Sequence, residues 1–245
     1  MANTRSKREA ARGNNDSAER REVNQLSRIS VTKGAPAATP ELKSGQRKRL
    51  ADRDFTHAPH QVRIIAGKWK RTSVAVPSVA GLRPTPDRVR ETLFNWIEHL
   101  IPDLAAARGL DLFAGTGVLG LEFASRGAQR VTLVESNREL LLQLIETKRR
   151  LAADQVDIVA GDALSVAARC PAASFEAIFV DPPFDSELAA PAIVAAARLV
   201  SPNGLIYVEG GAPTADSLVA AAGLQRVRQS RAGRVFFCLL RPAAA

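Results

Sequence analysis

The fold is best predicted from a glycine-rich segment, Gly109-Leu-Asp-Leu-Phe-Ala-Gly-Thr-Gly-Val-Leu-Gly120. Its apolar first half predicts a short buried strand over 110–114, and its glycines predict a sharp turn into a helix that begins near Val118. The spacing Gly115-x-Gly117-x-x-Gly120 matches the dinucleotide-binding fingerprint, because such a turn brings bare backbone against a ligand. The loop therefore predicts a nucleotide site without identifying the nucleotide.

Two acidic residues narrow the choice of cofactor. Glu135 ends a second apolar strand, Val131–Glu135, and lies 20 residues after Gly115, where a carboxylate accepts hydrogen bonds from ribose hydroxyls. Both NAD and S-adenosylmethionine carry such a ribose. Asp111 lies ahead of the glycines, where its charge would oppose a pyrophosphate but attract an aminoacyl ammonium group. The two carboxylates together favour S-adenosylmethionine.

The rest of the chain alternates between helix and strand patterns. Periodicity predicts helices over 138–153, 165–169 and 188–199 and strands over 156–160, 177–180 and 205–209. Such alternation with short connections predicts a doubly wound parallel sheet. The last two strands, 224–229 and 235–240, are separated only by a short loop and should pair as a hairpin. We therefore predict an α/β, Rossmann-like fold whose mixed seven-stranded sheet ends in an antiparallel C-terminal hairpin.

The carboxyl ends of the parallel strands should form one ligand-binding edge. Asp111 is expected to bind the aminoacyl group, Glu135 the ribose and Asp162 the adenine amine. A turn residue without a ligand is the other interpretation of Asp162. The full set of expected cofactor-binding residues is Asp111, Phe113, Ala114, Gly115, Gly117, Glu135, Ser136, Asp162 and Ala163.

The fourth strand ends in Asp181-Pro-Pro-Phe184, for which we predict a catalytic role. The lone pair of a nucleobase amine is delocalised into its ring, so methylation requires acceptors that orient the amine. The Asp181 carboxylate and the Pro182 carbonyl supply such acceptors, and Pro183 stiffens the turn. Phe184 is placed to stack on the base. Taken alone, a strand followed by Asp-Pro-Pro is often only a turn. In combination with the nucleotide loop upstream, a catalytic role becomes the favoured interpretation.

Two basic segments precede the glycine loop. Residues 61–80 predict a small β-hairpin whose turn carries a cluster that suits nucleic acid, Arg63, Lys68, Trp69, Lys70 and Arg71. The other interpretation is a solvated hairpin with a packed tryptophan. Residues 85–100 predict an amphipathic helix capped by Thr85. Cations at its start oppose the helix dipole, so we expect Arg83, Arg88 and Arg90 either to bind RNA or to pair with Asp87 and Glu91.

The charge of the chain is concentrated in its first 59 residues. This segment carries 13 Lys or Arg against 7 Asp or Glu. The whole chain of 245 residues has a formal net charge of +9. Its composition predicts a disordered basic extension, either an arm that tethers RNA or a solvated tail. Neither a membrane span nor a signal peptide is expected, so we predict a cytoplasmic monomer. The two cysteines and three histidines have no metal-ligand spacing, which predicts no metal site.

Four segments together resemble the RsmD-type methyltransferases: Arg63-Ile-Ile-Ala-Gly-Lys-Trp69, Leu82-Arg-Pro-Thr-Pro-Asp-Arg-Val-Arg-Glu-Thr-Leu-Phe-Asn-Trp96, Asp111–Gly120 and Asp181–Phe184. The resemblance covers roughly residues 61–241 and implies a class I methyltransferase domain over 60–245. It implies S-adenosylmethionine as donor and the exocyclic N2 of a guanine in 16S ribosomal RNA, within a small ribosomal subunit or its assembly intermediate, as acceptor. The long basic tail departs from the compact family pattern.

Three other functions share part of this pattern. An adenine-N6 methyltransferase acting on DNA or RNA would use the same Asp-Pro-Pro-aromatic chemistry, and only the flanking family segments argue against it. An NAD-dependent dehydrogenase would need a hydride-transfer site, for which the sequence places no His or Lys near a strand end. A non-catalytic RNA-binding protein would share the charge but has no need of Asp181.

Overall fold

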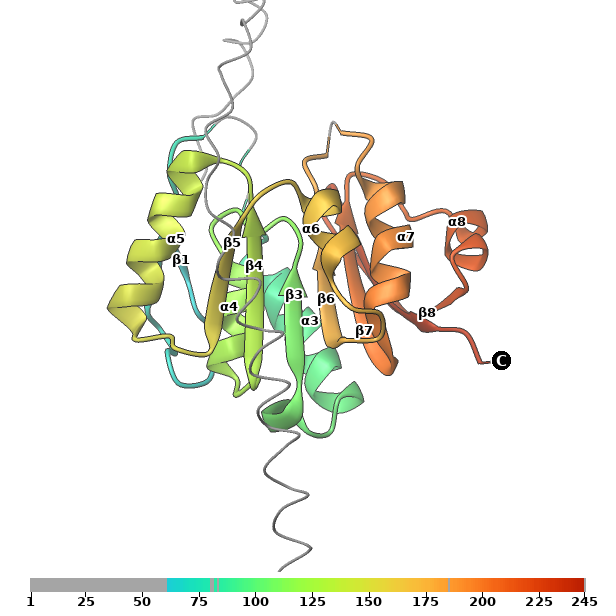
Figure 1. The fold of residues 1–245 in the computed structure, drawn as a ribbon, viewed down its shortest axis with the longest axis horizontal. Coiled ribbons are helices and arrows are strands. Elements are labelled where there is room, and N and C mark those ends of the chain that lie inside the picture. The colour runs from blue at the N-terminus through green and yellow to red at the C-terminus, as the bar shows by residue number, and fades with distance from the viewer. Residues whose placement is uncertain (1–60, 80–81, 83, 185, 245) are drawn as a thin grey trace, which may run out of the picture. The chain divides into compact units, whose positions relative to one another are not determined.

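The computed structural model describes residues 61–79, 82, 84–184 and 186–244 (Figure 1). The expected disorder of the basic extension therefore lies outside the described residues. No helix in the described part is both long and apolar enough to cross a membrane. The elements in chain order are β1 (Gln61–Arg63), β2 (Ser73–Ala75), α3 (Asp87–Leu100), a 3₁₀ turn (Leu104–Ala106), β3 (Arg108–Asp111), α4 (Val118–Ser125), β4 (Arg130–Glu135), α5 (Arg138–Leu151), β5 (Val156–Ala160), α6 (Ala163–Arg169), β6 (Phe175–Val180), α7 (Ala189–Leu199), β7 (Val200–Gly210), α8 (Asp216–Ala221), β8 (Leu224–Ala232) and β9 (Val235–Pro242).

Seven of the strands form one mixed sheet in the order β5-β4-β3-β6-β7-β9-β8. The first five of these are parallel, and β9 is antiparallel to both β7 and β8. β1 and β2 form a separate antiparallel pair. The predicted fold class is confirmed, including the C-terminal hairpin and the small N-terminal hairpin.

Side chains alternate between the two faces of the sheet, as the period of a strand requires. On one face, Leu133, Phe179, Tyr207 and Leu239 pack with the hairpin, α3, α4 and α5. On the other face, Val134, Ile178, Ile206 and Leu240 pack with α6, α7 and α8. Figure 1 shows α6 and α7 in front of the strands and α3 behind them. This covering on both faces explains why the central strands are almost entirely apolar.

The largest departures from the sequence-based expectation are two strand boundaries and one additional helix. β3 ends at Asp111, so residues 112–117 belong to the loop rather than to the strand. β7 begins at Val200, because the segment with Pro202 and Gly204 continues the strand past an irregularity in its pairing with β6. α8 was not predicted, because it has six residues and buries only Val219, too little for a periodic pattern.

The N-terminal hairpin is fastened to α4 by a fully buried carboxylate. Glu122 accepts hydrogen bonds from the backbone N–H groups of Ile65 and Ala66 at 2.6 and 2.9 Å and from Arg126 at 2.8 Å. Gly67 approaches so closely that a Cβ there would lie 1.8 Å from the Ser125 carbonyl oxygen. Because α4 follows the glycine loop directly, the hairpin is held in a defined place relative to that loop.

Candidate active site at the carboxyl ends of the strands

The strand order reverses between β3 and β6, and this is the position where an open α/β sheet binds ligands. From β3 the chain proceeds outward through β4 and β5, and then returns to β6 on the other side of β3. Asp111 is the last residue of β3, and Asp181 directly follows β6. The structure thus brings together two carboxylates that lie far apart in sequence.

Asp111 is a buried carboxylate with one oxygen left without a partner. Its Oδ2 accepts a hydrogen bond from the Gly120 N–H at 3.2 Å, whereas its buried Oδ1 accepts none from the described residues. Burial raises the pKa of Asp111 from 3.8 to about 7, and the charge of Glu135 adds to this. An unpaired buried acceptor is costly, so this atom calls for a donor from a ligand. An ammonium group meets that need.

The glycine loop leaves no room for side chains where it meets the rest of the fold. Gly115 and Gly117 have φ values of 55° and 79°, in the left-handed region that favours glycine. A Cβ at Gly117 would lie 2.5 Å from Leu144 Cδ2, and one at Gly120 would lie 2.2 Å from Leu133 Cδ2. Since α4 begins at Val118 as predicted, the loop presents its backbone at the start of a helix.

Glu135 connects the end of β4 to the glycine loop. Its Oε2 accepts a hydrogen bond from the Gly115 N–H at 2.8 Å, and its Oε1 accepts from Ser136 and Asn137 at 2.8 and 2.7 Å. The carboxylate is half-buried, and Oε2 retains a lone pair for a ribose hydroxyl. Its observed role is to hold the loop, and its expected role toward ribose stays a prediction.

Replacing Glu135 by alanine is expected to weaken S-adenosylmethionine binding by about 1–3 kcal/mol, because hydrogen bonds to a buried ligand are lost. Calorimetry of cofactor binding measures this loss. Glu135→Gln is the matched variant, since its amide oxygen still accepts a backbone N–H but carries no charge. Unchanged affinity in Glu135→Ala would exclude the ribose assignment.

Asp162 caps α6. Its Oδ1 accepts a hydrogen bond from the Ser165 N–H at 2.8 Å, and this bond lowers the pKa of Asp162. The side chain is exposed at the end of β5, beside the buried Ala163. The capping role accounts for this residue in the structure, and its contact with adenine stays a prediction.

Asp181 is half-buried and lies beside buried polar side chains that the sequence analysis did not bring together. The Thr85 hydroxyl donates to Asp181 Oδ2 at 3.4 Å, and the Tyr207 hydroxyl donates to Glu209 Oε2 at 2.6 Å. Burial, the charge of Glu209 and the charge of Asp111 raise the pKa of Asp181 well above its usual range. The expectation that Thr85 caps α3 is wrong, because Pro86 holds the cap position and no side chain caps that helix.

The aromatic residue of the Asp-Pro-Pro-Phe motif is available for stacking. Phe184 is 38% exposed, which is unusual for a large apolar side chain in this fold. Its ring lies over bare backbone, since a Cβ at Gly211 would be 3.6 Å from ring atom Cδ2. Pro182 is buried and Pro183 is exposed. These positions are compatible with the predicted roles of the motif and do not test them.

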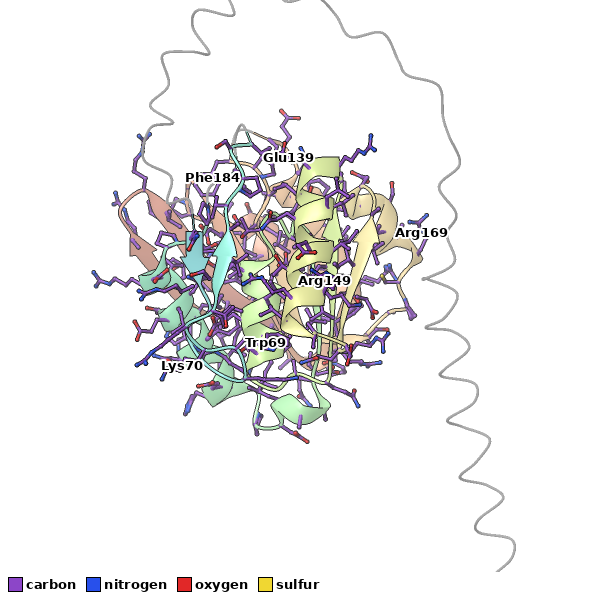
Figure 2. All side chains as sticks on the ribbon, turned by 90° about the vertical axis from the view of Figure 1, so that its left-hand side faces the viewer. Trp69, Lys70, Glu139, Arg149, Arg169 and Phe184 are labelled. Carbon is purple, nitrogen blue, oxygen red and sulfur yellow. The ribbon has the colours of Figure 1, made fainter. Side chains whose placement is uncertain are left out.

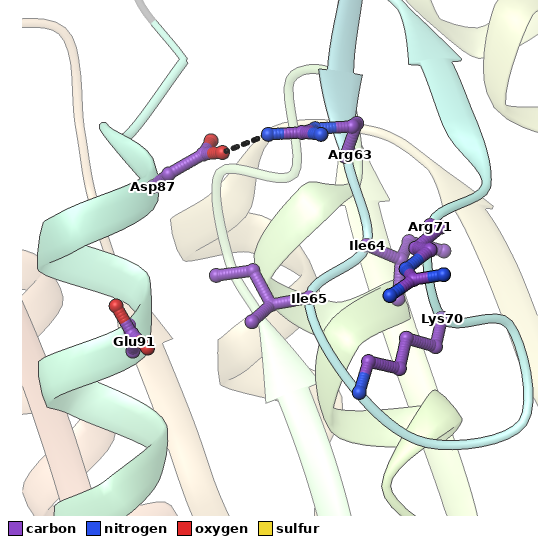
Figure 3. Close-up of a pocket in the computed structure, with 7 residues that line it drawn as sticks. All are labelled: Arg63, Ile64, Ile65, Lys70, Arg71, Asp87 and Glu91. Atoms are coloured by element: carbon purple, nitrogen blue, oxygen red, sulfur yellow. Dashed lines mark ion pairs between the residues drawn. The ribbon is translucent and has the colours of Figure 1, made fainter.

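Five of the basic residues predicted to bind RNA lie on the surface: Arg63, Lys68, Lys70, Arg71 and Arg88. Figure 2 shows Lys70 and Phe184 toward opposite ends of one side of the molecule. A pocket of about 210 Å³ opens between the hairpin and α3 (Figure 3), lined by Arg63, Ile64, Ile65, Lys70, Arg71, Asp87 and Glu91. Arg63 pairs with Asp87 across it at 3.7 Å, so the positive charge of this pocket is partly neutralised.

Two predicted RNA contacts are wrong because the side chains are inside the protein. Arg90 is 0% exposed and donates to the Thr85 and Arg63 carbonyls and to Asp87, which ties α3 to the hairpin. Trp69 is 6% exposed and packs in the core, as the other interpretation held. Arg83 lies outside the described residues, and its predicted role stays untested.

Thr85, Tyr207 and Glu209 are the residues that the sequence analysis missed. For Glu209 a signal was present, because it follows the apolar run Leu205–Val208 in the sequence as Glu135 follows the apolar run that ends at Val134. Thr85 carried no such signal, since a threonine before a proline at a helix start indicates a cap. Tyr207 looked like an ordinary strand residue.

The comparisons with known proteins agree with the motif-based resemblance. The family model described as conserved hypothetical protein 95 matches residues 62–241. The ribosomal RNA small subunit methyltransferase D of Escherichia coli (strain K12) is 43% identical over 164 residues, which are 63% of this chain and 79% of that protein. The protein of the same name from Haemophilus influenzae is 39% identical over 158 residues, 62% and 80% of the two chains.

A solved structure is also similar. The Escherichia coli protein yhhF superimposes with a TM-score of 0.64 at 37% identity, covering 76% of this chain and 99% of that one. It shares the arrangement of strands and helices on which the strand-end edge depends. The chain therefore belongs to the family of the ribosomal RNA small subunit methyltransferases D, which the conserved hypothetical protein 95 model describes.

Proposed function

We propose that this protein transfers a methyl group from S-adenosylmethionine to the exocyclic N2 of a guanine in 16S ribosomal RNA. The observation that carries the proposal is the pair of carboxylates at the switch point of the sheet, Asp111 with an unpaired buried oxygen and Asp181 behind an exposed Phe184. The relatives named ribosomal RNA small subunit methyltransferase D support methyl transfer to small-subunit ribosomal RNA.

The described residues fit S-adenosylmethionine better than a dinucleotide. Asp111 binds the aminoacyl ammonium group through its free Oδ1, Glu135 the ribose and Asp162 the adenine amine. When bound, the cofactor supplies an electrophilic methyl group on a positively charged sulfur. The carboxyl groups of Asp111 and Asp181 lie at this edge and, when ionised, favour that charge, whereas they would repel the pyrophosphate of NAD.

Asp181 and the following turn orient the acceptor amine. The Asp181 carboxylate and the Pro182 carbonyl accept the two amine hydrogens, which directs the nitrogen lone pair toward the methyl carbon. Phe184 stacks on the extruded base and holds the plane of the base, so that the amine stays directed toward the methyl carbon. The transfer is direct, so the contribution of the protein is orientation and stabilisation of the positive charge that develops on the nitrogen.

The experiment that tests this function is methyl transfer in vitro to small-subunit ribosomal RNA, followed by mapping of the methylated position. Methylated guanine-N2 at a single position is the expected result, and the same position should be unmethylated in cells that lack the protein. Methyl transfer to adenine in place of guanine would identify an adenine-N6 methyltransferase and contradict the proposal.

The exposed cations of the hairpin turn are proposed to bind RNA phosphates. Removing them in the variant Lys68→Gln, Lys70→Gln, Arg71→Gly should reduce the slope of log affinity against log salt by about 2, at roughly 0.7 for each lost contact with single-stranded RNA. Glycine suits position 71, because Arg71 has a φ of 67° and lies in the left-handed region. RNA binding measured over a range of salt concentrations gives the slope.

Arg169→Gln is the control for this experiment. Arg169 is equally exposed but lies on α6, over the other face of the sheet. Its variant should keep the full salt slope. If the hairpin variant also keeps the full slope, its turn does not bind RNA phosphates.

A further inference from the structure

Glu209 is a buried carboxyl group that the reaction described above does not use. It follows Val208 within β7, and Val208 pairs with Val180 on β6, so Glu209 and Asp181 are at the same level of two adjacent parallel strands. Glu209 is 3% exposed. Burying an ionisable side chain there costs free energy unless hydrogen bonds or an opposite charge compensate for the lost hydration.

Two hydroxyl groups tie Glu209 to its surroundings. The buried Tyr207 hydroxyl donates to Glu209 Oε2 at 2.6 Å and so favours the ionised form of Glu209. The buried Thr85 hydroxyl donates to Asp181 Oδ2 at 3.4 Å, and its proximity to Glu209 lowers the pKa of Glu209. Because Thr85 has a single proton to donate, its hydroxyl lies between two carboxyl groups and links their orientations.

Two neighbouring carboxyl groups, the buried Glu209 and the half-buried Asp181, do not ionise independently. Burial raises the pKa of both, and the charge of Glu209 raises the pKa of Asp181 further. The other titratable groups that face the pair are Asp111 from β3, Tyr207 from β7 and, beside Tyr207, Cys238 from β9. Glu209 therefore keeps the negative charge, and Asp181 is the carboxyl group that takes up a proton most readily.

We propose that Glu209, held by Tyr207 and linked through Thr85, is a positioning residue that aims the Asp181 carboxylate and makes it the acceptor of the proton released by the methylated base. The inference rests on the proposed role of Asp181. When the nitrogen–carbon bond forms and the carbon–sulfur bond breaks, the positive charge moves from sulfur to nitrogen. The N–H bond then breaks, an O–H bond forms at Asp181, and both the base and the carboxyl group become neutral.

The first test is the pH dependence of methyl transfer in Glu209→Gln. Asp181 must be ionised to accept a proton, so activity should rise with pH through the pKa of Asp181. Glutamine keeps the hydrogen bond from Tyr207 but removes the negative charge beside Asp181, which lowers the pKa of Asp181. The acid limb of the pH–activity profile should therefore move to lower pH by about one unit or more. Glu146→Gln, which removes an exposed charge on α5, should leave the limb in place.

The second test uses Thr85 and applies even if the Glu209 variant does not fold. Thr85→Val keeps the shape of the side chain and removes the link, so turnover should fall about tenfold or more at unchanged cofactor affinity. Thr85→Ser should restore turnover, because serine supplies the same hydroxyl.

The outcomes separate the inference from the proposed function. If the acid limb of the pH profile does not move in Glu209→Gln, or if Thr85→Val keeps normal turnover, the inference is overturned. The proposed role of Asp181 still stands in that case if Asp181→Ala is inactive. Normal turnover in Asp181→Ala overturns both.

Discussion

Replacing Asp181 by alanine is expected to reduce methyl transfer by at least about 100-fold while cofactor affinity changes only a few-fold. Removing one preorganised polar group that stabilises a transition state costs about 10² to 10³ in turnover. The proposed cofactor contacts lie on other strands, at Asp111, Glu135 and Asp162, so binding should be preserved. Single-turnover rates with saturating RNA and calorimetry with S-adenosylmethionine measure the two quantities.

Asp181→Asn is the matched variant for this prediction. Its amide oxygen still accepts one amine hydrogen, but it carries no charge and does not take up the released proton. Its turnover should therefore lie between those of the wild type and Asp181→Ala. Near-normal turnover in Asp181→Ala would show that another group orients the amine.

Replacing Asp111 by asparagine is expected to weaken S-adenosylmethionine binding by about ten- to a hundredfold, because a charge-assisted hydrogen bond to the ammonium group becomes a neutral one. The same change should stabilise the ligand-free protein at alkaline pH. The pKa of Asp111 is about 7 in the folded protein, against an ordinary value of 3.8 in the unfolded chain. The folded state therefore binds a proton that the unfolded state releases, and stability falls as pH rises between these values.

Thermal unfolding at pH 5 and pH 8 tests the stability half of this prediction. The gain in stability of Asp111→Asn over the wild type should be larger at pH 8, since the buried charge is then fully present. Asp162→Asn is the control: the hydrogen bond from Ser165 lowers the pKa of this exposed cap, so the carboxylate is ionised at both pH values and its variant should lose the same stability at each. If the stability gained by Asp111→Asn is the same at pH 5 and pH 8, burial of the Asp111 charge does not destabilise the folded protein.

Local pattern was sufficient wherever the deciding interactions are close in sequence. The turn from β3 into α4 depends on glycines within a few residues of each other, at 115 and 117, and it was predicted correctly. The strand-end edge followed as well, because a parallel sheet places the carboxyl ends of its strands together.

The errors arose where contacts join distant parts of the chain. Arg90 and Trp69 look like members of a basic, aromatic surface, but both are buried because the hairpin docks on α4. The hydrogen bond that fastens this docking joins Ile65 to Glu122, 57 residues apart. Local periodicity carries no information about such a contact. The basic and aromatic composition of these segments therefore led to the prediction that two core residues lie on the surface.

The fold class and the edge formed by the strand ends could be predicted from sequence, because strand alternation and a glycine turn are properties of short segments. Which carboxyl groups lie together depends on the tertiary structure. Thr85 and Asp181 are 96 residues apart, and Glu209 joins them because β6 and β7 lie side by side. The proton affinity of Asp181 depends on burial and on neighbouring charges, and both exist only once the sheet has formed.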